Sequence, residues 1–127
     1  MERQDYIVTV ESYFAALDAG RLDEVLSYFN VDATFTVQTA FTTFTGRDAE
    51  IRGLFEQFIS AYENILHTDF EHIVDPSGQA ISSRFRVELY NKVGGHETKQ
   101  SVNQWYFENG KFQRVYTWIG GENVLGT

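Results

Sequence analysis

The sequence has no cysteine and only one proline among its 127 residues. The missing cysteines exclude disulfides, thiolate nucleophiles and zinc sites with cysteine ligands, and they are compatible with a reducing cytoplasm. The scarcity of proline, together with an aromatic content of 16%, is typical of a packed domain and not of a disordered chain. We therefore expect a folded domain without covalent cross-links.

Basic residues and long apolar runs are also scarce. Lys and Arg number 10 against 18 Asp and Glu, and the resulting charge of −8 argues against a nucleic acid partner, because phosphate backbones attract clustered basic residues. No apolar run approaches the roughly 20 residues that span a bilayer. Met1 to Asp5 also lack the basic and apolar layout of a signal peptide. We expect a cytoplasmic protein with neither a membrane nor a nucleic acid partner.

The histidines do not have the spacing of metal ligands. A helical pair four residues apart, or a set that converges with carboxylates, would be needed to hold zinc. His67, His72 and His96 form neither pattern. We expect no metal and no cofactor.

The first half of the chain has the apolar spacing of three helices. Apolar residues that recur every three or four positions would share one face of the first helix: Ile7, Val10, Phe14 and Leu17. Gly20 can end this helix in the left-handed conformation. The same spacing restarts over residues 22–29 and again over residues 51–62.

The second half alternates between apolar and polar residues, which is typical of strands. We expect long strands over residues 65–74, 79–91, 97–107 and 111–119, and one or two short strands over residues 34–44. Asn109-Gly110 is the strongest hairpin signal in the chain. The order of helices and strands predicts one α+β domain, residues 1–127, with a core over about 6–119 and a loose tail at 120–127.

Both faces of the last two strands carry large apolar side chains. We assign Gln104 and Tyr106 to the pocket face of the sheet, together with Thr117 of the last strand. The opposite face would then hold Trp105, Phe107, Tyr116 and Trp118. A large exposed apolar face usually marks an interface, so we expect a homodimer through these residues. Cover by the C-terminal tail is the alternative.

Short motifs in a fixed order resemble the nuclear transport factor 2-like superfamily, and within it the SnoaL-like proteins and ketosteroid isomerases. They are a helix–glycine–helix start, Asp32-Ala33-Thr34, Gly46-Arg47-Asp48 before a helix, and Glu108-Asn109-Gly110-Lys111 in the last hairpin. The resemblance implies a cystatin-like α+β barrel, in which a curved, mixed or antiparallel sheet forms a cone around three N-terminal helices. It also implies an apolar pocket inside the cone and a dimer on its convex face.

The catalytic residues of ketosteroid isomerases carry over only in part. The resemblance places the catalytic base at Val37, which cannot accept a proton, and an oxyanion donor at Tyr13. The second donor falls on Val102, or on Asn103 after a slip of one residue. Because general base catalysis contributes about 10²–10⁴-fold, we do not expect ketosteroid isomerase activity.

Other members of the superfamily dehydrate, cyclise or open epoxides, and a His–Asp pair would suit such chemistry. His67 and Asp69 are two residues apart on an expected strand, so both side chains would point to one face. Tyr13 could then complete the site as a hydrogen-bond donor. The alternative is that His67 is a surface histidine beside an acidic residue.

Three functions follow from these patterns. The first is the binding of a small apolar molecule, without catalysis, in a pocket lined by Tyr13, Val37, Phe55, Phe85, Gln104, Tyr106 and Thr117. The second is a lyase-, cyclase- or dehydratase-like enzyme that uses Tyr13 with His67 and Asp69. The third is an accessory subunit whose Trp105 and Trp118 face binds a different chain. The missing base at Val37 favours the first.

Overall fold

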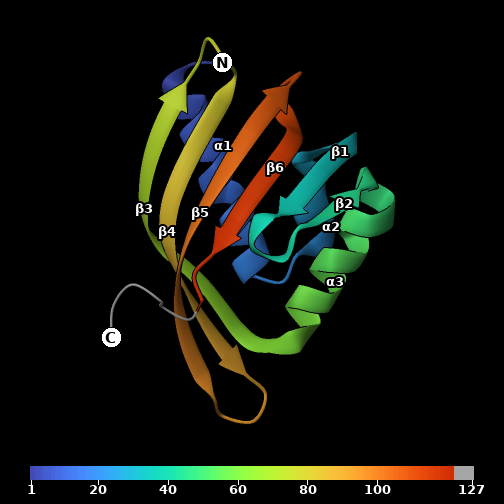
Figure 1. The fold of residues 1–127 in the computed structure, drawn as a ribbon, viewed down its shortest axis with the longest axis vertical. Helices are drawn as coiled ribbons and strands as arrows, with labels where there is room; N and C mark the ends of the chain where they lie inside the picture. Colours follow the sequence, from blue (N-terminus) through green and yellow to red (C-terminus); the bar gives the residue numbers. More distant parts are fainter. Residues whose placement is uncertain (122–127) are drawn as a thin grey trace.

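The computed structural model describes residues 1–121 and has an α+β fold (Figure 1). Most of the tail expected at residues 120–127 lies outside the described residues. Gly120 is inside them, and its backbone N–H donates to the Gln100 carbonyl at 2.8 Å, which continues the sheet by one residue. None of the described helices is long and apolar enough to cross a membrane. The cytoplasmic location stays a prediction.

Helices and strands follow the predicted order. They are α1 (Arg3–Asp18), α2 (Leu22–Ser27), β1 (Phe29–Val37), a short 3-10 helix (Gln38–Ala40), β2 (Thr42–Thr45), a π-helical turn (Gly46–Ile51), α3 (Arg52–Ala61), β3 (Tyr62–Asp75), β4 (Ala80–Asn91), β5 (His96–Glu108) and β6 (Lys111–Ile119). The second helix is shorter than expected, because Phe29 begins β1. There Phe29 is fully buried beside Phe112, and the Tyr28 carbonyl accepts the Phe112 backbone N–H at 2.9 Å.

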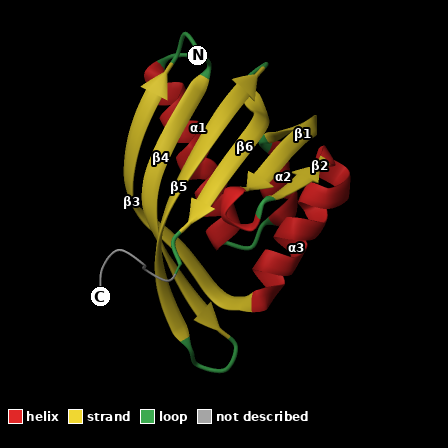
Figure 2. Cartoon of the chain, viewed as in Figure 1, coloured by secondary structure: helices red, strands yellow, loops and turns green. Residues whose placement is uncertain are grey.

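The strands form one six-stranded sheet in the order β2-β1-β6-β5-β4-β3. Neighbouring strands from β3 to β6 are antiparallel, as predicted, and so are β1 and β2, but β1 runs parallel to β6. The sheet is therefore mixed. It curves in front of α1, while α3 lies beside β1 and β2 (Figure 2).

An aromatic core fills the space between α1 and the sheet. Tyr13 lies at its centre, 1% exposed, with the rings of Phe112 and Phe29 at centroid distances of 5.3 and 5.9 Å. Trp105 is fully buried in the same cluster. Aromatic side chains from α1 and the sheet therefore make up the centre of the core.

A bulge in the last hairpin exchanges the two faces of β5 that the sequence analysis assigned. The register shifts between Tyr106 and Phe107, so that Gln104 pairs with Tyr116, and Asn103 pairs with Thr117. Directly paired residues share a face of the sheet, and a shift by one residue turns a strand's side chains to the other face. The assignment of Gln104 and Tyr106 to the face of Thr117 was therefore wrong.

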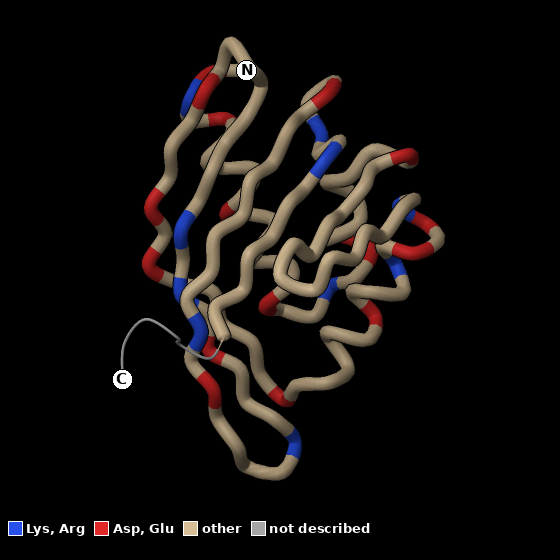
Figure 3. The backbone as a smooth tube through the Cα atoms, viewed as in Figure 1, with Lys and Arg blue, Asp and Glu red and all other residues tan. Residues whose placement is uncertain are grey.

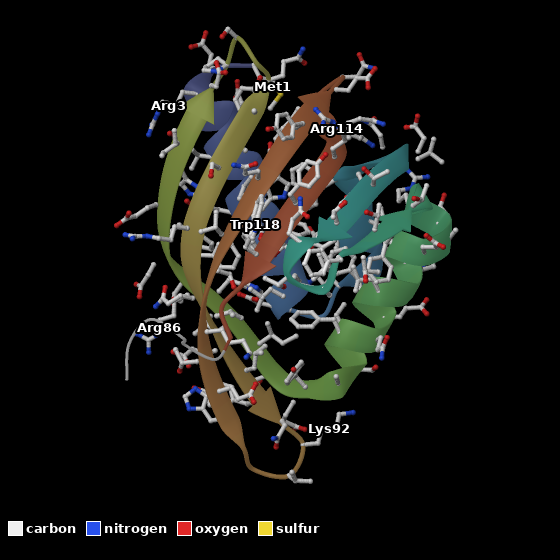
Figure 4. The ribbon with its side chains drawn as sticks, in the orientation of Figure 1. Met1, Arg3, Arg86, Lys92, Arg114 and Trp118 are labelled. Carbon is white, nitrogen blue, oxygen red and sulfur yellow. The ribbon has the colours of Figure 1, made fainter. Side chains whose placement is uncertain are left out.

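The same shift corrects the expected dimer face. Trp105 and Phe107 point into the core, where they are 0% and 5% exposed, so they cannot contact another chain. Tyr116 and Trp118 do lie on the outward face, and Trp118 is 38% exposed (Figure 4). Trp105 is likewise unavailable to an accessory partner. Self-association through the outward face stays a prediction, now restricted to Tyr116 and Trp118.

Candidate active site

A cavity of about 130 Å³, partly open to solvent, lies between α1, α3 and the concave face of the sheet. It is lined by Tyr13, Phe14, Leu17, Phe35, Val37, Leu54, Phe55, Phe58, His67, Phe85, Val87, Leu89, Lys99, Ser101, Asn103, Thr117 and Ile119. Its volume is close to that of the engineered protein cavity of about 150 Å³ that binds benzene. The enclosed space therefore suits one six-membered ring or a short chain.

Most of the predicted pocket residues line this cavity: Tyr13, Val37, Phe55, Phe85 and Thr117. Gln104 and Tyr106 do not, because the bulge turns them to the convex face. There they border a separate shallow groove with Ile73 and Asp75.

His67 points into the cavity and is held there by a carboxylate that the sequence analysis did not consider. Asp18, the last residue of α1, lies with its Oδ1 2.5 Å from the His67 Nδ1, and its Oδ2 accepts the His67 backbone N–H at 2.8 Å. The imidazole stacks on the Phe14 ring at a centroid distance of 4.4 Å. The side chains of His67 and Asp18 are 6% and 16% exposed. His67 is therefore an oriented histidine inside a cavity and not a surface residue.

Asp69 does not partner His67. It has a φ of 58° and lies where the register of β3 shifts between Thr68 and Glu71. A bulge breaks the two-residue alternation on which the predicted pair depended. The Asp69 side chain is 72% exposed, and its Oδ2 lies 3.9 Å from an Arg86 nitrogen.

Tyr13 brings a protonated hydroxyl to the cavity wall. Burial raises the pKa of this hydroxyl, and the nearby negative charge of Asp18 raises it further. The hydroxyl therefore stays protonated over the whole practical pH range and can act as a hydrogen-bond donor. No hydrogen bond to it comes from the part of the chain that the structure describes, so it is available to a ligand.

Three polar side chains of β5 alternate along the concave face: Lys99, Ser101 and Asn103. Asn103 is 3% exposed, and its Oδ1 has no hydrogen-bond partner among residues 1–121. A buried polar atom without a partner costs about 1–3 kcal/mol. Because this oxygen is itself closed off from solvent, a ligand in the cavity does not reach it, and the Asn103 contact with the cavity is made by the rest of the side chain.

Asp18 and Lys99 are not among the residues predicted for the site, but each has a signal in the sequence. Asp18 is the last residue of α1, where a negative charge is unfavourable because the helix dipole is negative at that end. An acidic residue at this position therefore indicates a role other than helix stability. Lys99 and Asn103 belong to a run of polar residues two apart in a strand of a domain rich in aromatics. Neither signal identifies the partner, because Asp18 and His67 are 49 residues apart in sequence.

Charged residues are spread around the edges of the fold and the outer strands (Figure 3). Within residues 1–121, no group of three or more His, Asp and Glu side chains lies close enough together to hold a metal ion. The ionisable and polar groups at the cavity are His67 with its partner Asp18, Tyr13, Thr117 and the polar residues of β5.

The chain matches a family model described as the SnoaL-like domain over residues 10–115. No curated protein matches it significantly. One similar solved structure is that of SalBIII, an epoxide hydrolase/cyclase-like enzyme with a role in pyran ring formation in the polyether salinomycin. Its TM-score is 0.82 and its sequence identity is 18%. The match covers 94% of this chain and 93% of that chain.

Two further structures extend the comparison. A nuclear transport factor 2-like protein of unknown function from an Exiguobacterium species has a TM-score of 0.77 and 20% identity, covering 90% of this chain and 99% of that chain. A protein with a ketosteroid isomerase-like fold from Catenulispora acidiphila, solved in complex with trimethylamine, has a TM-score of 0.75 and 15% identity, covering 86% of this chain and 82% of that chain. At such identities the likeness establishes the fold and not the activity.

Proposed function

The chain belongs to the SnoaL-like domain family, and from this we propose that it is an enzyme that moves a proton on a small, mostly apolar substrate, with His67 as the general base. The proposal treats residues 1–127 as a single domain of this family, with its core over about 6–119. The observation that carries it is the contact between the His67 Nδ1 and Asp18 at 2.5 Å, with the imidazole against the cavity. This assignment replaces the predicted pair of His67 and Asp69.

The Asp18 carboxylate fixes the orientation of the imidazole. A carboxylate that accepts the Nδ1 proton leaves the Nε2 lone pair free to take a proton from a substrate. The imidazolium formed in that step is stabilised by the same carboxylate. His67 can then return the proton to another atom of the substrate, which is the general requirement of isomerisation, dehydration and ring closure.

The opposite charge that develops on the substrate needs hydrogen-bond donors. The Tyr13 hydroxyl remains protonated and lines the cavity, and the Thr117 hydroxyl and the Asn103 amide lie on the sheet side of it. Preorganised donors around a developing oxyanion are often the largest single contribution to catalysis. We still do not expect ketosteroid isomerase chemistry in its usual form, because the resemblance places that base at Val37.

Binding of a small apolar molecule without catalysis is the second candidate function. It is favoured by the lining of the cavity, which consists mainly of Phe, Leu and Val side chains. Such walls provide affinity through burial of apolar surface, whether or not His67 acts.

Exchange of carbon-bound hydrogen in deuterated water separates the two functions. Cyclohexanone, 2-cyclohexen-1-one and acetophenone are suitable probes, because each has one six-membered ring and protons next to a carbonyl. We expect the wild-type protein to accelerate exchange at these positions, followed by NMR, and His67→Gln to reduce the acceleration by about 10²–10⁴-fold.

The matched control is His96→Gln, because His96 lies on the β4–β5 hairpin outside the cavity. This variant should retain the wild-type rate. Binding of the ketones without any exchange above the rate in buffer would contradict the enzyme proposal and support the binding function.

A further inference from the structure

Lys99 is a cation in the wall of an otherwise largely apolar cavity. Its side chain is only 30% exposed, so most of it is removed from solvent. Within residues 1–121, its ion-pair partner is Glu97, whose Oε2 lies 4.0 Å from the Lys99 Nζ and whose side chain is 62% exposed. A lysine side chain with a partner at this distance retains capacity to bind an anion, because the ion pair with Glu97 is long and mostly exposed.

The register of the sheet places Lys99 in one row with His67. Val87 of β4 pairs with His67 of β3 on one side and with Lys99 of β5 on the other, and all three residues line the cavity. Neighbouring strands are about 4.8 Å apart, so the two backbones are about 10 Å apart across the sheet. Both side chains extend over the same concave surface, and a small molecule can reach both.

A second polar group marks the inner part of the cavity. Asn103 lies four residues from Lys99 on β5, about 13 Å along the strand. Its Oδ1 is buried away from the cavity, so this oxygen does not contact a ligand, and the rest of the side chain forms part of the wall. The cavity therefore has one cationic group, Lys99, and a polar side chain further along the same strand, with apolar walls between them.

We propose that the substrate is a small carboxylate whose anionic group is bound by Lys99 and whose apolar body fills the rest of the cavity. The inference rests on the proposed function, because it names the substrate class of the same cavity. A single ammonium group matches a monoanion, whereas a phosphate dianion would need additional donors or cations.

The net charge of −8 makes a cation at the cavity more important for the binding of an anionic ligand. The field of the whole protein repels anions, so an anionic ligand needs a local cation to enter the cavity. Lys99 supplies that charge where water is partly excluded, and there an ion pair is stronger than in bulk solvent.

A pair of isosteric probes tests the anchor without any chemical reaction. Cyclohexanecarboxylate and cyclohexanecarboxamide differ in charge but hardly in shape. Titration by calorimetry at pH 7.5 and low salt should give the carboxylate about tenfold tighter binding to the wild-type protein. Lys99→Met keeps the length of the side chain and should abolish the preference for the carboxylate while leaving the affinity for the amide unchanged.

The control is Lys92→Met, at the tip of the β4–β5 hairpin and remote from the cavity (Figure 4). It removes the same charge and should keep the preference. Equal affinity of the two probes for the wild-type protein, no binding of the carboxylate at tens of millimolar, or a preference that survives Lys99→Met would each overturn the proposal. Because binding involves no proton transfer, such a failure leaves the exchange experiment with neutral ketones unaffected, and failure of that experiment does not affect this one.

Discussion

The pair of Asp18 and His67 brings the end of a helix and the middle of a strand to one wall of the cavity. Asp18 makes two contacts with His67, one to the ring and one to the backbone N–H. The second contact fixes the carboxylate independently of the protonation state of the ring. The pair is therefore already arranged before a substrate enters, which is the property expected of a general base and its orienting group.

Asp18→Asn should remove the base without removing the histidine. An amide that donates to Nδ1 would place the ring proton on Nε2, which could then no longer accept a proton from the substrate. We expect exchange of the ketone probes to fall by about 10²–10⁴-fold while their affinity stays near the wild-type value. Asp23→Asn alters a carboxylate that is 91% exposed and should leave the rate unchanged. A wild-type rate for Asp18→Asn would contradict the assigned role.

Tyr13→Phe tests the proposed oxyanion donor. The ring would stay in the aromatic core, and no hydrogen bond within residues 1–121 would be lost, so the free energy of unfolding should change by less than about 1 kcal/mol. The exchange rate should fall by about 10²-fold, the usual effect of one missing donor. The loss should be the same at every pH, because burial keeps the Tyr13 pKa far above the range tested. An exchange rate equal to that of the wild type would show that Tyr13 serves only in the packing of the core.

At the scale of elements, a second ionisable cluster stabilises the hairpin of β4 and β5, outside the cavity. Glu88 lies opposite Thr98, and its carboxylate accepts the Thr98 hydroxyl at 2.6 Å. His96 Nε2 and Arg86 Nε each lie 2.5 Å from the same carboxylate. These contacts, led by the Thr98 hydroxyl, lower the pKa of Glu88 from its usual 4.5 to about 2.

The lowered pKa predicts a pH-dependent contribution to stability. A carboxylate with a lower pKa in the folded state stabilises that state fully above its unfolded pKa and loses this effect as the pH falls toward its folded pKa. Glu88→Gln should therefore lower the melting temperature most at neutral pH, and the difference from wild type should shrink between about pH 4.5 and about pH 2. Thermal unfolding followed by circular dichroism measures it. A difference that does not depend on pH would refute the role of the charge.

The turn between β1 and β2 holds a bulky residue in an unfavourable backbone conformation. Phe41 has a φ of 53° and is 94% exposed. Asparagine adopts this left-handed region more easily, so Phe41→Asn should stabilise the fold by about 0.5–1 kcal/mol in chemical denaturation. Val93→Asn changes another apolar residue, 92% exposed, that does not have a positive φ, and it should have little effect. Destabilisation by Phe41→Asn would reveal a contact that the single chain does not contain.

At the scale of the molecule, aromatic side chains also lie outside the core, on the convex face of the sheet. The Tyr116 ring lies between those of Tyr106 and Trp118, and the Arg114 guanidinium covers the Tyr106 ring at 4.3 Å. Native mass spectrometry should show a dimer, and Trp118→Arg should shift it to a monomer, because a charge would be buried without a partner. A monomeric wild-type protein would contradict self-association through this face.

Local patterns in the sequence were sufficient to predict most of the elements and the family. Apolar residues at helical spacing predicted the buried face of α1, and Asn109-Gly110 predicted the last hairpin. Tyr13, Val37 and Thr117, which the sequence predicted for a pocket, line the cavity. These features depend on the periodicity of side chains within one element and on the residues of turns. Both can be recognised from residues that are close together in the sequence.

The tertiary structure alone decided which face of β5 meets the cavity and which acid meets His67. One extra residue in the last hairpin turned Trp105 inward and Gln104 outward, although either register fits the alternation of the strand. A bulge at Asp69 likewise turned the nearer acid away, while the packing of α1 on β3 brought Asp18 to His67. Both outcomes depend on the register of strands and on contacts between distant segments, which are set by the packing of the whole core and not by any local pattern.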